Sequence, residues 1–282
     1  MTPDPCPAVP LEDLAQDVLG KACRGLGMSP AQLAAAAGVT PAQVEAALAG
    51  DVVADRVLLA LAGPLGLRGP ALVELARGAW RPGPVALDGL AQFTTPFGDM
   101  TVNAWLVWDP STREAAAFDT GADAAPMIAF LASRGLRLTG IFITHTHTDH
   151  VVDLPALRRA TGSPPVWSHA LEPLAGTETF RIEPATGWSV GGLRITPRAT
   201  HGHSKAGVTY VIEGLARPVA VVGDAVFAGS MGGGAVSYAD ALRTNHAEIF
   251  TLPNDTVLCP GHGPATSVGE EKLHNPFFQA GP

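Results

Sequence analysis

The sequence is short of cysteine and of basic residues, and each shortage excludes a class of protein. Its 282 residues hold three cysteines and no CxxC pair, so we expect a cytoplasmic protein without structural disulfides. There are 18 Lys and Arg against 26 Asp and Glu, and the net charge of −8 argues against a surface for nucleic acid or anionic membranes. No apolar run approaches the roughly 20 residues that cross a bilayer, and residues 1–7 lack the basic and apolar parts of a signal peptide.

The first 84 residues are predicted to be a tail followed by a small all-α domain. Residues 1–10 contain four prolines, which is typical of an extended or flexible segment. From residue 11 onward apolar residues recur at helical spacing, and Ser29 and Thr40 each precede a proline, as an N-cap precedes the first residue of a helix. We assign the helical domain to residues 11–84, with a linker rich in proline and glycine at its end.

Two of these short helices, on either side of Gly38, resemble the helix-turn-helix of phage-repressor-like regulators. The second of them, residues 41–49, offers no Arg or Lys, although contacts to phosphate supply most of the affinity for DNA. We therefore expect no nucleic-acid partner, and we predict that the helices pack on the rest of the chain or mediate a homodimer.

Three histidines and an aspartate fall within six residues directly after an apolar, β-branched run at 138–144. They are His145, His147, Asp149 and His150. The run predicts a buried strand, so the motif is placed at a strand end, where α/β folds carry their sites. Imidazole and carboxylate are common metal ligands, and this HxHxDH pattern predicts a metal site.

Three distant segments repeat the arrangement of a short apolar run, a glycine and a ligand-type residue. They lead to His201-Gly202-His203, to Asp224 and to His262. Glycine lets the backbone turn sharply and approach a metal closely. A lone buried Asp224 would be very costly unless it were paired or bound to metal. We expect these strand ends to complete the site.

As a set, these segments resemble the metallo-β-lactamase fold superfamily, and within it the small glyoxalase II-type hydrolases (hydroxyacylglutathione hydrolase-like). Residues 223–230 resemble a GDxLFxGS segment, 260–264 a PGHGP segment and 271–277 an ExxxNPF ending. The resemblance covers about residues 88–280. It implies an α/β fold, a four-layer αββα sandwich over residues 85–282, preceded by the all-α domain.

The resemblance also implies a ligand set for two divalent ions, with zinc first and iron or manganese as alternatives. The first ion would be held by His145, His147 and His203, the second by Asp149, His150 and His262, and Asp224 would bridge both. The roles of His201, His169 and His274 stay open. The segment at 229–234 carries glycines where relatives often place an arginine and an acid, so no substrate-binding residue is assigned.

The implied reaction is hydrolysis of a small-molecule acyl thioester of the S-(2-hydroxyacyl)glutathione type. A metal-bound hydroxide would attack the carbonyl, and Asp149 would hold that hydroxide as the catalytic residue. Three alternatives remain: a persulfide dioxygenase-like oxidoreductase with one iron at the first site, a lactone or phosphoester hydrolase, and a ligand-sensing regulator with a DNA-binding N-terminal domain.

Overall fold

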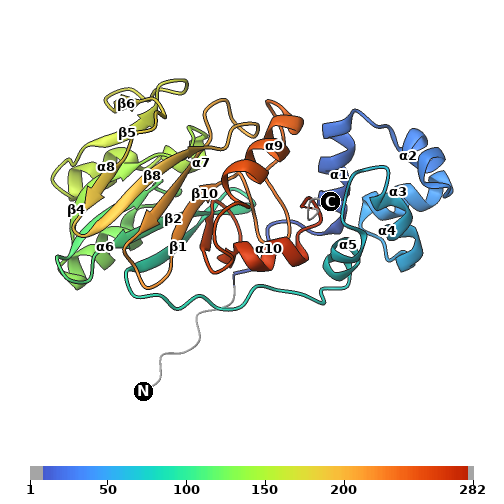
Figure 1. Ribbon diagram of the computed structural model, residues 1–282, viewed down its shortest axis with the longest axis horizontal. Coiled ribbons are helices and arrows are strands. Elements are labelled where there is room, and N and C mark those ends of the chain that lie inside the picture. Colours follow the sequence, from blue (N-terminus) through green and yellow to red (C-terminus); the bar gives the residue numbers. More distant parts are fainter. Residues whose placement is uncertain (1–8, 279–282) are drawn as a thin grey trace, which may run out of the picture.

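The computed structural model describes residues 9–278, and most of the predicted tail at residues 1–10 lies outside them. Five helices come first, namely α1 (Ala15–Leu26), α2 (Pro30–Ala37), α3 (Pro41–Ala49), α4 (Asp55–Ala62) and α5 (Gly69–Ala76). The predicted caps are confirmed, because Ser29 and Thr40 accept hydrogen bonds from the backbone N–H three residues on. Figure 1 places these helices together at one end of the molecule.

Two six-stranded mixed sheets follow the helices. The first has the order β1-β2-β3-β4-β5-β6 and is formed by β1 (Leu90–Phe97), β2 (Met100–Trp108), β3 (Glu114–Phe118), β4 (Arg137–Phe142), β5 (Val166–His169) and β6 (Glu178–Phe180). The second has the order β12-β11-β10-β9-β8-β7 and is formed by β7 (Trp188–Val190), β8 (Leu193–Ala199), β9 (Val208–Glu213), β10 (Val219–Gly223), β11 (Val257–Pro260) and β12 (Thr266–Ser267). Parallel pairing joins β3, β4, β5 and β6 in the first sheet and β10 to β11 in the second.

The two sheets pack face to face, and helices cover their outer faces. Phe118 and Phe142 of the first sheet stack between the layers and contact Tyr210 of the second. The outer face of the first sheet packs against α6 (Ala125–Arg134) and α8 (Leu154–Ala160), which follows the one-turn α7 (Thr148–Val151). The second sheet is covered by α9 (Tyr238–Glu248) and α10 (Val268–His274). The predicted αββα sandwich, preceded by helices, is confirmed.

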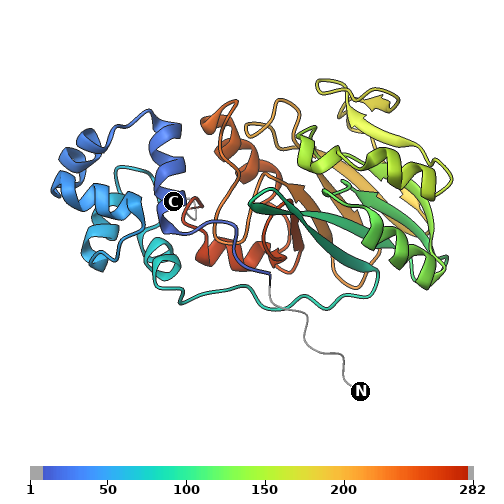
Figure 2. The same cartoon turned by 180° about the vertical axis from the view of Figure 1, so that it is seen from behind.

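The N-terminal helices share one hydrophobic cluster with the second sheet and its helices. Leu19 and Leu72 belong to the same buried cluster as Val222, Phe277 and Phe278. Figure 2 shows the segment after α5 running along the sandwich toward β1. Because the core is continuous, the proposed division into domains at residue 84 stays a prediction. Within residues 9–278, no helix is long and apolar enough to cross a bilayer.

Candidate metal centre

The HxHxDH segment leaves the carboxyl end of β4 and turns directly into α7. Thr144, two residues beyond β4, is fixed by Asp119: its backbone N–H donates to Oδ1 at 2.8 Å and its hydroxyl to Oδ2 at 2.7 Å. His147 takes the N-cap position of α7. The first two predicted ligands therefore lie ahead of the helix and the last two within it, and this single turn divides the motif between two groups of side chains.

The first group joins three histidines and an aspartate from three strand ends: His145, His147, His203 and Asp224. The Nδ1 atom of His147 lies 3.0 Å from His145 Nε2 and 3.1 Å from His203 Nε2. Asp224 Oδ2 lies 3.3 Å from His203 Nε2 and 3.8 Å from His145 Nε2. Since His147 is exposed while His145 and Asp224 are buried, the group opens to solvent on the side of His147.

The second group is formed by Asp149, His150 and His262. Asp149 Oδ2 lies 3.3 Å from His262 Nε2 and 3.6 Å from His150 Nε2. Asp224 borders this group as well, because its Oδ1 is 3.4 Å from His150 Nε2 and its Oδ2 is 3.4 Å from His262 Nε2. The structure thus brings all seven predicted ligands together and places Asp224 between the two groups, while their binding of metal stays a prediction.

These atoms are spaced as ligands of divalent ions are. Ligands about 2.0–2.1 Å from a tetrahedral ion lie about 3.3 Å apart. The separations given above run from 3.0 to 3.8 Å, and all ligand atoms of each group lie within 4.8 Å of one another. His150 Nε2 and Asp224 Oδ1 are buried without a hydrogen-bond partner among the described residues. Such orphaned atoms are costly, and a bound ion would satisfy both. Nitrogen and oxygen donors suit zinc, iron or manganese alike.

The opposite ring nitrogen of three of these histidines donates a hydrogen bond that fixes the ring. Such bonds keep the other nitrogen free as a ligand. The pairs are His150 Nδ1 to Asp119 Oδ2 at 2.8 Å, His203 Nδ1 to the Gly233 carbonyl at 2.8 Å, and His262 Nδ1 to the Thr101 carbonyl at 2.6 Å.

Asp119 is the site residue that sequence reasoning missed. Its buried carboxylate accepts both hydrogen bonds from Thr144 and the one from His150, and its backbone lies in the left-handed region at φ 58°. A signal was present, because Asp119 directly follows the apolar end of β3, as Asp224 follows β10. The signal was weak, because β3 is rich in alanine and no histidine lies beside Asp119 in the sequence.

The carboxylates control the charge of the two buried histidines in the second group. Burial alone would lower the pKa of His150, but Asp224 and Asp119 outweigh it and raise that pKa to about 10. Burial is likewise outweighed at His262, where hydrogen bonds to Asp149 and Asp224 raise the pKa to about 11. Both imidazole rings are therefore protonated on both nitrogens, and positively charged, at neutral pH while no metal is bound.

The three histidines whose roles were left open belong to neither group. His201 accepts a hydrogen bond at its carbonyl from Thr244 at 2.9 Å. His169 accepts one at Nδ1 from the backbone N–H of Leu171. His274 lies at the contact with the N-terminal helices, where its Nδ1 is 2.7 Å from Glu74 Oε2 and its ring stacks on Trp80.

Comparison with known proteins agrees with this geometry. The chain is 31% identical to a probable metallo-hydrolase of Streptococcus pyogenes, over 57% of this chain and 79% of that one. It is 34% identical to a hydroxyacylglutathione hydrolase of Cereibacter sphaeroides, over 56% of this chain and 61% of that one. The crystal structure of ETHE1 from Myxococcus xanthus superimposes with a TM-score of 0.57 at 26% identity, over 66% of this chain and 83% of that one. A family model described as the metallo-beta-lactamase superfamily matches residues 97–262, and the chain therefore belongs to that superfamily.

Proposed function

We propose that this metallo-hydrolase cleaves an acyl thioester of the S-(2-hydroxyacyl)glutathione type with two divalent metal ions. The observation that carries the proposal is the place of Asp224, whose carboxylate is within 3.8 Å of ligand nitrogens in both groups. Its position suits a ligand shared by two ions. Similarity to a hydroxyacylglutathione hydrolase supports the thioester as the substrate class.

Asp149 is the proposed catalytic residue. Its side chain is 14% exposed, so the carboxylate is not fully closed off from solvent. A carboxylate there can accept a hydrogen bond from the attacking water and orient it toward the substrate carbonyl. Two bound ions would supply a water whose pKa is near 7 instead of about 15.7, and would polarise the carbonyl. A thiolate leaves readily, so the reaction requires no strong general acid.

The test combines metal content with a substrate panel. Protein purified without chelators or added metal should contain about two equivalents of zinc, iron or manganese. It should release thiol from S-lactoylglutathione, and Asp149→Asn should lose turnover and hold the second ion more weakly while keeping the first. Asp109→Asn is a matched control, because that carboxylate caps a turn with bonds to Ser111 and Gly192 away from the site.

Other outcomes would replace the proposal. One equivalent of iron together with oxygen uptake on a persulfide would indicate a dioxygenase. Two equivalents with cleavage of lactones or phosphoesters, and none of thioesters, would leave the metal site correct and the substrate class wrong. Failure to take up any metal would overturn the site itself.

A further inference from the structure

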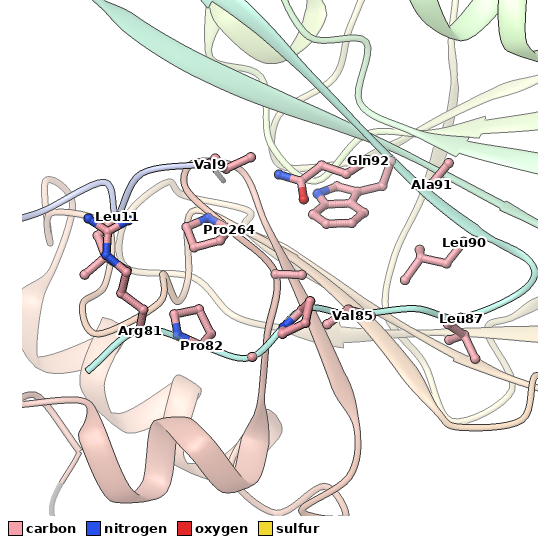
Figure 3. Close-up of a pocket in the computed structure, with 14 residues that line it drawn as sticks. Val9, Leu11, Arg81, Pro82, Val85, Leu87, Leu90, Ala91, Gln92 and Pro264 are labelled. Atoms are coloured by element: carbon pink, nitrogen blue, oxygen red, sulfur yellow. The ribbon is translucent and has the colours of Figure 1, made fainter. Parts of the chain in front are cut away.

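A cavity of about 350 Å³ lies between the linker after α5, strand β1 and the loop that follows His262 (Figure 3). This volume is in the range of small-molecule sites, which is roughly 300–1,000 Å³. None of the seven proposed metal ligands lines the cavity, so it is not part of the metal centre. The proposed hydrolysis therefore leaves the cavity without a role.

Most of the cavity wall is apolar and only partly covered by the rest of the protein. Val85, Leu87, Leu90 and Ala265 pack against the core between the two sheets and also line the cavity. All four side chains keep an intermediate exposure. Apolar surface left in water is unfavourable, and an apolar ligand would cover it. The cavity is therefore suited to a hydrocarbon group.

Hydrogen bonds hold two walls of the cavity in place. In the linker, the backbone N–H of Gly83 donates to Glu270 Oε1 at 2.9 Å. On the opposite strand layer, Trp105 Nε1 donates to the Pro260 carbonyl at 2.9 Å. These contacts join segments that are far apart in the sequence, so the cavity exists before any ligand enters. A site that is already formed lowers the cost of binding.

Arg81 gives the cavity one charged end. It is the only charged residue in the described part of the chain that lines the cavity, and within residues 9–278 its guanidinium forms neither a hydrogen bond nor an ion pair. The amide of Gln92, which also lines the cavity, already donates to the Gly263 carbonyl at 3.1 Å. Figure 3 shows Arg81 at one end of the cavity and Leu87 and Leu90 at the other. The cavity thus has a cationic end and an apolar end.

We propose that this cavity binds an elongated apolar carboxylate, such as a medium-chain fatty acid, with the carboxylate on Arg81 and the chain toward Leu87 and Leu90. The guanidinium fork matches a carboxylate and can donate two parallel hydrogen bonds to it. A neutral head group would leave that charge unused, and a cation would be repelled by it. Binding requires neither turnover nor the thioester substrate, so it stands apart from the proposed hydrolysis.

The test compares ligands that share one chain and differ in the charge of the head group. In calorimetric titrations of the protein as purified, octanoate should bind more tightly than octanol, and octylamine least tightly. From butanoate to octanoate, affinity should rise by roughly fourfold per methylene as more of the wall is covered. Arg81→Gln should weaken octanoate by roughly three- to fivefold, which is typical of an exposed ion pair, and remove its advantage over octanol. Ala265→Phe should weaken all three ligands, because the ring would occupy the cavity.

Controls locate the binding and decide between the outcomes. Arg159→Gln removes the same charge from an exposed position on α8 and should leave octanoate binding unchanged. If denaturant unfolding shows that Ala265→Phe is not folded, Val85→Gln replaces it, because it puts a polar group into the apolar wall. Octanoate that binds Arg81→Gln and the wall variant as tightly as wild type is bound elsewhere, the metal centre included, and the proposal is then wrong. Absence of binding at millimolar octanoate, or equal binding of the three ligands to wild type, would also overturn it.

Discussion

Replacing Asp119 with asparagine should weaken binding of the second metal ion far more than binding of the first. Asp119 touches neither proposed ion, yet it accepts hydrogen bonds from the Thr144 backbone, the Thr144 hydroxyl and His150 Nδ1, at 2.7 to 2.8 Å. A carboxylate can accept all three. Asparagine has one acceptor oxygen and one donor NH₂, so it cannot.

Either orientation of the asparagine fails. If its NH₂ faces His150, the ring must accept at Nδ1, and the proton moves to Nε2, the atom that faces Asp149 and Asp224. If the NH₂ faces Thr144 instead, two donors meet in a buried place, at a cost of about 1–3 kcal/mol. Loss of such a supporting partner reduces metal affinity or activity by about 10–100-fold.

The assay is competition for metal with a chromophoric chelator, read together with turnover. Wild-type protein should show two tight sites, and Asp119→Asn one tight and one weakened site with turnover reduced to match. Asp109→Asn, which also removes a charge from a buried turn, should lower stability without changing metal affinity. Two unchanged tight sites in Asp119→Asn would refute the assignment of His150 to the second ion.

Three other measurements test the charges and the packing. Since the pKa values of His150 and His262 are raised to about 10 and 11 without metal, loading both ions at pH 7.5 should release about two protons, measurable by calorimetry in buffers of different ionisation enthalpy. Burial raises the pKa of Glu271 from 4.5 to about 7, so the folded protein is destabilised as this carboxyl ionises. The unfolding free energy of metal-free wild type minus that of Glu271→Gln should therefore fall by roughly 2–3 kcal/mol between pH 5 and pH 8. A difference that does not change with pH would contradict this. Gly25→Ala should destabilise by about 1–3 kcal/mol in denaturant unfolding, because the new Cβ would lie 2.2 Å from the α9 tyrosine ring. Gly20→Ala, which meets only the end of an arginine side chain, should be neutral or stabilising.

The meeting of the seven proposed ligands could be predicted because each of their segments follows the end of a strand. The local sequence is sufficient for such a prediction, because an apolar run followed by a glycine and a polar residue indicates both the strand and the place where it ends. The glycine before His262 shows the physical need, since a Cβ on Gly261 would lie 2.1 Å from Asp224 Oδ1. The resemblance to a known family then supplied which strand ends meet. Asp119 follows the same rule, but an isolated aspartate after alanines carries too little local signal.

Packing of the N-terminal helices on the rest of the chain was one of two predicted possibilities, but the surface that they cover could not be predicted, because it depends on contacts between residues more than 200 positions apart. The amphipathic spacing of these helices indicates that one face of each is buried, but it does not indicate which other part of the chain that face contacts. In the structure that face completes the core beneath the second sheet, and Asp13 and Lys21 join it to the loop after Asp224. A buried ion pair such as Asp13 with Lys21 stabilises this packing only while both partners are present, because either charge alone would be buried without compensation. The helices are therefore joined directly to the loop that follows Asp224, the residue proposed to bridge the two ions.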